Sequence, residues 1–258
     1  MKCLFVFLLL PILCLAKVRL PAIFSDHSVF QQESGNPIWG WAKPGEEITV
    51  STSWGTAESA IADKEGRWMV ISYTQKAGTG HKVTIEGTNK IILKNVAVGE
   101  VWLCAGQSNM GWSMGNSFEA EKEASVNLPH FRIFKSAREH WHEPLEENRG
   151  RLAAWKPCDP KSAAETSAVS YYFGKKLHQK LGVPVGIIQR AFAGTPIEGW
   201  MPWGIQSADP RTIAHKKLLD DGSNRLIARG QTKQKALANY QKELKEYNDK
   251  IDRGETMK

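Results

Sequence analysis

A serine follows the abrupt end of an apolar run in the sequence Val101-Trp-Leu-Cys-Ala-Gly-Gln-Ser-Asn-Met110. The run stops at Gly106, and Ser108 follows within a polar turn. A strand that breaks at glycine and presents a serine just past its C-terminal end is the arrangement by which acyl-transfer enzymes expose a nucleophilic hydroxyl. A serine in this position can equally cap the next helix. The pattern therefore leaves two roles open for Ser108, nucleophile and helix cap.

A second glycine-containing turn follows another apolar run, Val183 to Ile188. It reads Gln189-Arg-Ala-Phe-Ala-Gly-Thr-Pro-Ile-Glu-Gly-Trp200 and falls at the same edge of the sheet as Ser108 if both runs are parallel strands. The tetrahedral intermediate of acyl transfer carries a negative oxygen, which backbone N–H groups in such a turn can bind. The alternative is an ordinary turn that needs glycine for a positive φ. Two turns of suitable chemistry together favour catalysis.

A serine hydroxyl needs a base within hydrogen-bond reach to attack an ester at neutral pH. No histidine of this chain lies in an Asp-x-x-His pattern. His140 and His142 have a spacing that suits a metal, but no third ligand is indicated, so we predict no metal site. The source of the base stays open. The seven histidines are His27, His81, His130, His140, His142, His178 and His215.

Strands and helices alternate after Val96 and would position these turns. Runs at 96–105, 131–134 and 183–188 predict strands, while Glu119 to Val126 and Ser167 to Leu181 have helical spacing. Such alternation predicts a parallel α/β sheet with right-handed connections over residues 96–258. The residues of the longer helix that fall near one face are Val169, Tyr172, Phe173, Lys176 and Leu177.

Residues 17–95 have the pattern of a small antiparallel β-sandwich. Short β-branched and aromatic segments alternate with turns rich in Gly, Pro and Asp; the segments are Ile38–Trp41, Glu47–Thr52, Trp68–Ile71 and Lys82–Glu86. Four tryptophans fall in this region, at positions 39, 41, 54 and 68. They suit either a sugar-stacking platform or the core, and in so small a sandwich aromatic side chains favour the core.

The first 16 residues predict a secretory signal peptide, because Lys2 precedes an almost wholly apolar stretch that ends in small residues at Ala16. The stretch is short for a membrane span, and no other segment approaches that length, so we expect a secreted or periplasmic protein. The net charge of +7 is dispersed among acidic neighbours, which argues against nucleic acid binding. Cleavage leaves Cys104 and Cys158, for which free thiols are favoured over a disulfide.

The block Gly99–Met110 resembles the nucleophile block of the sialate O-acetylesterase family, a branch of the SGNH hydrolases. The similarity runs from about Leu20 to Trp203 and so covers both predicted domains. Further stretches are similar to that family in the same order: Leu20–Asp26, Pro37–Ala42, Gly66–Trp68, Ser167–Tyr171 with Phe173-Gly174, and Gly194–Glu198 with Trp200.

The resemblance implies an SGNH domain that carries an accessory β-sandwich and removes acetyl groups from sialic acids or related acetylated carbohydrates, without a metal or organic cofactor. It makes Ser108 the nucleophile, with the backbone N–H groups of Ser108 and Gly194 as the oxyanion hole. Gln107 and Asn109 flank the nucleophile and are candidate substrate-binding residues. Ala193 replaces the first residue of the family's usual Gly-Gly pair, and its methyl group can shift the oxyanion turn.

Family members also carry an Asn-bearing oxyanion block and an Asp/His pair far downstream, and neither has a counterpart here. From about residue 226 the chain is instead highly charged, with a narrow apolar stripe from Leu237 to Ile251 that needs a packing partner. We therefore expect an incomplete SGNH sheet, either in a truncated chain or in one that a partner completes, and weak or absent activity of the chain alone.

Two alternatives to an esterase stay open. One is a carbohydrate-binding protein without catalysis, which contacts an acetylated glycan through exposed tryptophans such as Trp54. The other is an unstable gene fragment. Neither the acetylated sugar nor the oligomeric state follows from the sequence.

Overall fold

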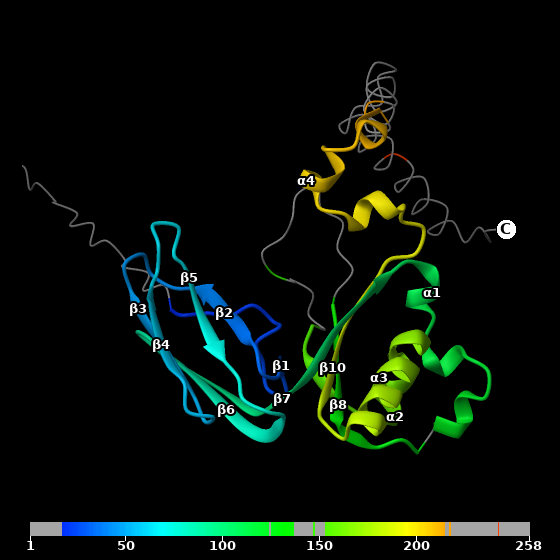
Figure 1. Cartoon of the computed structure of the whole chain (residues 1–258), viewed down its shortest axis with the longest axis horizontal. Coiled ribbons are helices and arrows are strands. Elements are labelled where there is room, and N and C mark those ends of the chain that lie inside the picture. Colours follow the sequence, from blue (N-terminus) through cyan, green and yellow to red (C-terminus); the bar gives the residue numbers. More distant parts are fainter. Residues whose placement is uncertain are drawn as a thin grey trace, which may run out of the picture. The chain divides into compact units, whose positions relative to one another are not determined.

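The computed structural model describes residues 17–123, 125–136, 147, 153–214, 217 and 242 (Figure 1). The chain divides into two compact units, Met1–Thr195 and Pro196–Lys258. The predicted signal peptide and the predicted C-terminal apolar stripe lie outside the described residues. All the residues predicted to take part in catalysis or binding lie in the first unit.

Two β-sheets build the first unit. The larger has eight strands in the order β4-β3-β6-β7-β10-β8-β9, with β1 beside β7, and the smaller pairs β2 with β5. The bounds are β1 (Val29–Gln31), β2 (Gly35–Trp41), β3 (Glu47–Thr52), β4 (Ala57–Ile61), β5 (Arg67–Tyr73), β6 (Gly78–Glu86), β7 (Lys90–Gly106), β8 (Leu128–Lys135), β9 (Trp155–Cys158) and β10 (Val185–Ala191).

Helices are short apart from one. The α-helices are α1 (Ser108–Gly111), α2 (Pro160–Glu165), α3 (Ala168–Leu181) and, in the second unit, α4 (Trp203–Gln206). The 3₁₀ turns are η1 (Met114–Asn116), η2 (Ala120–Glu123) and, in the second unit, η3 (Ile197–Trp200). The segment predicted to be helical from Glu119 to Val126 thus forms only a short 3₁₀ turn. No helix of the described residues is long and apolar enough to cross a membrane.

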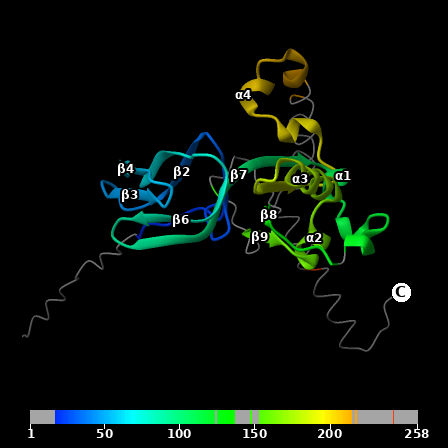
Figure 2. The same cartoon turned by 60° about the horizontal axis from the view of Figure 1, so that its bottom comes forward.

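The long strand β7 belongs to both halves of the first unit, as Figures 1 and 2 show. Its first part pairs antiparallel with β6, and its last part pairs parallel with β10. The boundary predicted between residues 95 and 96 falls inside this strand. The sandwich sheet and the parallel sheet are therefore one continuous mixed sheet.

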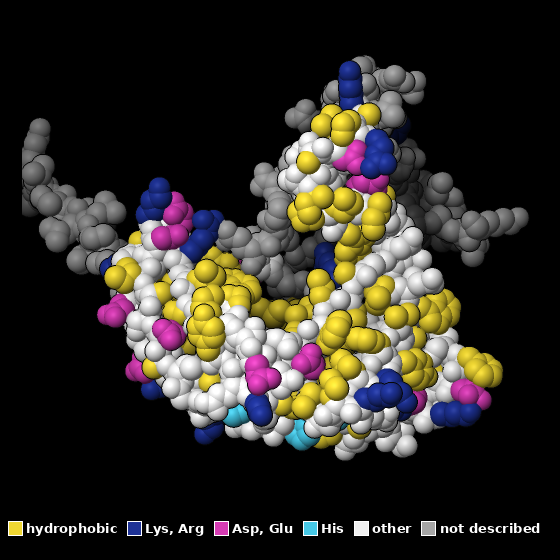
Figure 3. Space-filling model, viewed as in Figure 1, with side chains coloured by type: hydrophobic (Ala, Val, Ile, Leu, Met, Phe, Trp, Pro, Cys, Tyr) yellow, Lys and Arg dark blue, Asp and Glu magenta, His cyan; other side chains and the backbone are white. Residues whose placement is uncertain are grey.

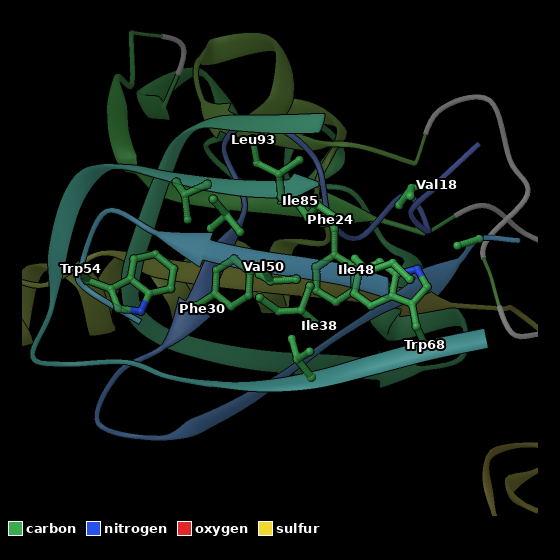
Figure 4. Close-up of a cluster of buried hydrophobic side chains, with 14 of the residues drawn as sticks. Val18, Phe24, Phe30, Ile38, Ile48, Val50, Trp54, Trp68, Ile85 and Leu93 are labelled. Atoms are coloured by element: carbon green, nitrogen blue, oxygen red, sulfur yellow. The ribbon is translucent and has the colours of Figure 1, made fainter. Parts of the chain in front are cut away.

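The sandwich core lies between the β2–β5 sheet and the larger sheet (Figure 4). Side chains of β5 alternate between buried and exposed, as expected of a strand with one face on a core. Trp54 and Trp68 are only 8% and 3% exposed and belong to this core, as their setting favoured. The alternative in which an exposed Trp54 contacts a glycan is wrong, because its ring is buried against Phe30, with the two ring centroids 5.8 Å apart.

Helix α3 packs on the parallel sheet through a face that overlaps the predicted one only in part, at Phe173 and Leu177. Tyr171 and Gly174 are buried, whereas Val169 and Tyr172 are 53% and 41% exposed. A Cβ atom at Gly174 would lie 2.5 Å from the ring of Phe131. The missing side chain lets the helix approach the sheet closely, so a glycine lies on the contact face beside the buried Tyr171.

Arg132 on β8 ties the two halves together from a fully buried position. Its guanidinium donates hydrogen bonds to the carbonyl oxygens of His27 (3.0 Å), Ser28 (3.4 Å), Asn95 (2.6 Å) and Pro129 (3.2 Å), and to Asn95 Oδ1 (3.1 Å). Burial lowers the pKa of Arg132 to about 10, so the side chain is still charged at neutral pH. A cation held by neutral oxygens thus fixes the sandwich loops to the parallel sheet.

Candidate active site

Ser108 is the first residue of α1, two positions after β7 ends at Gly106, and its side chain is exposed. The residue between them, Gln107, is the N-cap of the helix. The cap role considered for Ser108 therefore falls to Gln107. The hydroxyl of Ser108 is left at the end of a strand of the parallel sheet, where ligands of α/β proteins usually bind.

The side chain of Gln107 holds both groups through which Ser108 would react. Gln107 Oε1 accepts hydrogen bonds from the backbone N–H of Ser108 at 3.0 Å and from Ser108 Oγ at 2.8 Å. The N–H is the predicted oxyanion donor, and the hydroxyl is the predicted nucleophile. An amide oxygen orients the hydroxyl but is far too weak a base to deprotonate it.

The turn that contains Gly194 leaves the sheet beside Ser108. Ala191, at the end of β10, pairs with Gly106, at the end of β7, and the N–H of Phe192 donates to the carbonyl of Gly106 at 3.0 Å. Gly194 has φ 78°, and a Cβ atom there would have no neighbour within 4 Å. Glycine is favoured at this position by the backbone conformation and not by lack of space. Both turns thus begin at paired residues on the same edge of the sheet.

A buried polar cluster under α1 was not predicted from the sequence. The sulfur of Met110 accepts hydrogen bonds from Ser167 Oγ at 3.5 Å and Ser170 Oγ at 3.3 Å. Ser167 is the N-cap of α3, and its N–H donates to Gln189 Oε1 at 2.9 Å. These contacts connect α1 to α3 and β10, so they position the serine turn. The Ser-x-x-Ser spacing predicts a helix cap, but nothing in it indicates the methionine.

Two further side chains stand near Ser108 in the chain. Asn109 is exposed, and its carbonyl accepts a hydrogen bond from the N–H of Trp112. The Trp112 indole is 58% exposed and its Nε1 donates to the carbonyl of Asn116 at 3.1 Å. An indole held in this way presents an apolar surface to solvent four residues from the candidate nucleophile.

Histidines do not complete the site within the described residues. The hydrogen-bond partner of Ser108 Oγ there is Gln107. His140, His142 and His215 lie outside the described residues. No group of three or more His, Cys, Asp or Glu residues that could hold a metal occurs among residues 17–136 and 153–214, Ala124 apart. The described histidines that have a hydrogen bond bind elsewhere, His27 with Asn95, His81 with Ser53 and His178 with Val183.

Both described cysteines are free thiols, as predicted. Burial raises the pKa of Cys158 to about 12 and also raises the pKa of Cys104. Because the thiolate is the reactive form of cysteine, the raised pKa values make both thiols poor nucleophiles at neutral pH.

The family follows from a sequence match that contains both turns. Residues 98–253 match the family described as SASA, carbohydrate esterase, sialic acid-specific acetylesterase. The chain belongs to this family. Sialate O-acetylesterase from Rattus norvegicus is 32% identical over 200 residues, which cover 70% of this chain and 37% of that protein. The Homo sapiens sialate O-acetylesterase is 29% identical over 200 residues, which cover 70% and 38%.

A solved carbohydrate acetylesterase has a similar fold. The crystal structure of a carbohydrate acetylesterase from Xanthomonas citri superposes with a TM-score of 0.69 at 31% identity, covering 76% of this chain and 45% of that chain. These similarities confirm the family predicted from the sequence and the α/β fold with an additional antiparallel sheet. The chain spans less than two fifths of the length of the curated acetylesterases that it matches.

Proposed function

We propose that this chain carries the nucleophile of an acetylesterase that hydrolyses O-acetyl esters of carbohydrates, those of sialic acids in particular. The observation that carries the proposal is the exposed Ser108, the first residue of α1 after β7, beside the Gly194 turn, in a member of the sialic acid-specific acetylesterase family. The names of the relatives support the acetyl ester and the sugar, while the geometry supports the serine.

The proposed reaction begins when Ser108 Oγ attacks the carbonyl carbon of the acetyl group and its proton passes to a base. The resulting oxyanion is bound by the N–H groups of Ser108 and Gly194, and the sugar hydroxyl leaves with a proton. Water then attacks the acetyl-serine and releases acetate. No metal or organic cofactor takes part.

Gln107 has to change its contacts during this cycle. Its Oε1 accepts from the same N–H of Ser108 that would stabilise the oxyanion, so the amide and the oxyanion compete for one donor. We therefore assign Gln107 two successive roles: its side chain orients Ser108 before the attack and turns toward the substrate afterwards. Asn109, which follows Ser108 in the sequence and is exposed, is the second candidate for substrate contact.

The substrate and the compartment are part of the proposal. A net charge of +7 favours approach of an anionic sugar such as a sialic acid. The predicted signal peptide over residues 1–16 would deliver the protein to the periplasm or the exterior, where acetylated glycans are accessible.

The decisive experiment is labelling of the full chain with a fluorophosphonate probe, followed by intact-mass analysis. Ser108→Ala should abolish a label that Ser113→Ala, a change at a nearby serine, leaves intact. Because no base contacts Ser108 among the described residues, labelling should be slow. Imidazole, supplied as an external base, should raise p-nitrophenyl acetate turnover by the wild-type chain more than it raises turnover in the presence of Ser108→Ala, which reports the reaction of imidazole itself with the ester. Equal labelling of Ser108→Ala would refute the proposal.

A further inference from the structure

The outer face of the β2–β5 sheet is apolar where an antiparallel sheet is usually polar. Trp39 on β2 pairs across the sheet with Met69 on β5, and Trp41 pairs with Arg67. Met69, Arg67 and Trp41 alternate with buried neighbours and point away from the core, while Trp39 is partly buried and also packs against it. Figure 3 shows hydrophobic side chains gathered over these strands. Met69 is 58% exposed, although it lies in the middle of its strand.

A cavity of about 470 Å³ opens beside this face, and its lining also includes the inward-facing Gly40 and Trp68. The volume falls within the range of roughly 300–1,000 Å³ that is typical of small-molecule sites. Its lining includes Trp39, Trp41, Ile61, Asp63, Arg67 and Met69. It is built on strands other than β7 and β10, which carry the two turns of the candidate active site.

Both indoles are held in place by the fold. Phe24 packs edge-on against Trp39, with ring centroids 4.6 Å apart and an interplanar angle of 82°. The guanidinium carbon of Arg19 lies 3.7 Å from the ring centroid of Trp41, and Arg19 in turn pairs with Glu147 at 2.9 Å. Rings that are fixed in advance lose little conformational freedom when a ligand binds, which favours affinity.

A fixed carboxylate stands at the rim of the cavity. Asp63 Oδ1 accepts hydrogen bonds from the backbone N–H groups of Glu65 at 3.0 Å and Arg67 at 2.8 Å. Asp63 is exposed, and within the described residues no hydrogen bond uses its Oδ2. This oxygen is therefore an oriented acceptor for a donor on a ligand.

The combination of a flat apolar floor and a fixed acceptor suits a sugar. A pyranose ring has one face of C–H groups, which packs on aromatic rings, and a rim of hydroxyl groups, which donate to carboxylates. Trp39 and Trp41 are two residues apart on one strand, which spaces them by about 7 Å, enough for adjacent parts of a short oligosaccharide. A wholly apolar partner would instead desolvate Asp63 without offering a donor.

We propose that the cavity beside the outer face of β2 and β5 binds a carbohydrate chain, as a glycan site additional to Ser108. The site would hold the glycan that carries the acetylated sugar, and it rests on the proposed function only for that choice of ligand. Trp41 and Trp39 supply the stacking surface, and Asp63 accepts from the sugar hydroxyls.

The test is isothermal titration calorimetry of the full chain carrying Ser108→Ala with 3′-sialyllactose and, separately, with cellotetraose. At least one sugar should bind. Trp41→Ala and Asp63→Asn should each weaken that binding at least tenfold, and Trp41→Phe should weaken it less than Trp41→Ala. Tyr73→Ala is the matched control, since Tyr73 is an exposed aromatic residue on the same face of β5 but outside the cavity lining, and it should change affinity less than twofold.

Three results would overturn the proposal: no heat of binding with either sugar, equal loss of binding in Tyr73→Ala and Trp41→Ala, or a dimer in sedimentation velocity that Met69→Lys abolishes. Circular dichroism establishes that each variant is folded. Because binding is measured without the Ser108 hydroxyl, a failure of labelling at Ser108 and a failure of glycan binding are separate outcomes.

Discussion

The sandwich and the parallel sheet of the first unit differ in how completely their faces are covered. In the sandwich, two sheets bury a shared core that includes Ile38, Ile48 and Val83, all fully inaccessible to solvent. In the parallel sheet, Trp102 of β7 packs on Phe173 of α3, whereas Leu103 points to the opposite face and is 67% exposed. The first region is stabilised by packing on itself, and the second depends on one helical layer and on its connection to the sandwich.

Substitution of a large side chain by alanine should have the most different effects on stability in the two regions. Trp68→Ala in the sandwich should destabilise the protein by about 3–5 kcal/mol, because it removes a large buried ring and leaves a cavity. Leu103→Ala should cost about 0.5 kcal/mol or less, since the side chain is mostly exposed. Urea unfolding monitored by circular dichroism measures both. Comparable losses in the two variants would show that Leu103 is buried in solution and that the contrast is wrong.

Removal of the connection between the regions should have the next largest effect. Arg132→Met deletes the guanidinium and leaves the carbonyl oxygens of His27 and Asn95 without their donor, so we expect a loss of about 3 kcal/mol in unfolding free energy. Arg19→Met removes an exposed ion pair and should cost less than about 1 kcal/mol. If Arg132→Met were as mild as Arg19→Met, Arg132 would not be what joins the sandwich to the parallel sheet.

Lowering the pH should destabilise the packing of η2 on α3, by less than Trp68→Ala or Arg132→Met destabilises the protein. Desolvation opposes ionisation of Glu123, but hydrogen bonds from Lys175 (2.5 Å) and Tyr171 (2.6 Å) outweigh it and lower its pKa below the ordinary 4.5. A carboxyl with a lowered folded-state pKa stabilises the protein above pH 4.5, and that contribution is lost as the pH falls through the folded-state value.

The expected size of this pH effect is about 1 kcal/mol. Thermal unfolding at pH 6 and at pH 3 should show a larger drop for the wild-type chain than for Glu123→Gln, which cannot titrate at this position. Parallel curves for the two proteins would mean that Glu123 does not support the packing of η2 on α3.

The strands were the most predictable part of the fold, because alternation in segments such as Glu47–Thr52 reflects a single buried face. The contact face of α3 was predictable from hydrophobicity only in part, since close packing at Gly174 outweighs the bulk of Val169 and Tyr172. Nor did composition reveal that β7 is shared, because a strand that leaves one sheet and enters another keeps the same apolar pattern.

The candidate site, like the fold, could be predicted from the sequence only in part. Local motifs place Ser108 and Gly194 at strand ends, and the paired ends of β7 and β10 bring their turns to one edge. The two hydrogen bonds to Gln107 depend on a side-chain rotamer, and the contacts of Met110 join segments up to 60 residues apart. Tertiary contacts of this kind leave no local trace in the sequence.

The shared strand also sets the order of events during synthesis. Val29 and Phe30 pair with Ala97 and Val98, so the first strand of the sandwich has to wait for β7 before its pairing can form. At roughly 5–20 residues per second on the ribosome, that wait lasts several seconds. The nascent sandwich therefore spends this interval with an unpaired edge, and a chaperone that binds exposed strands has time to reach it.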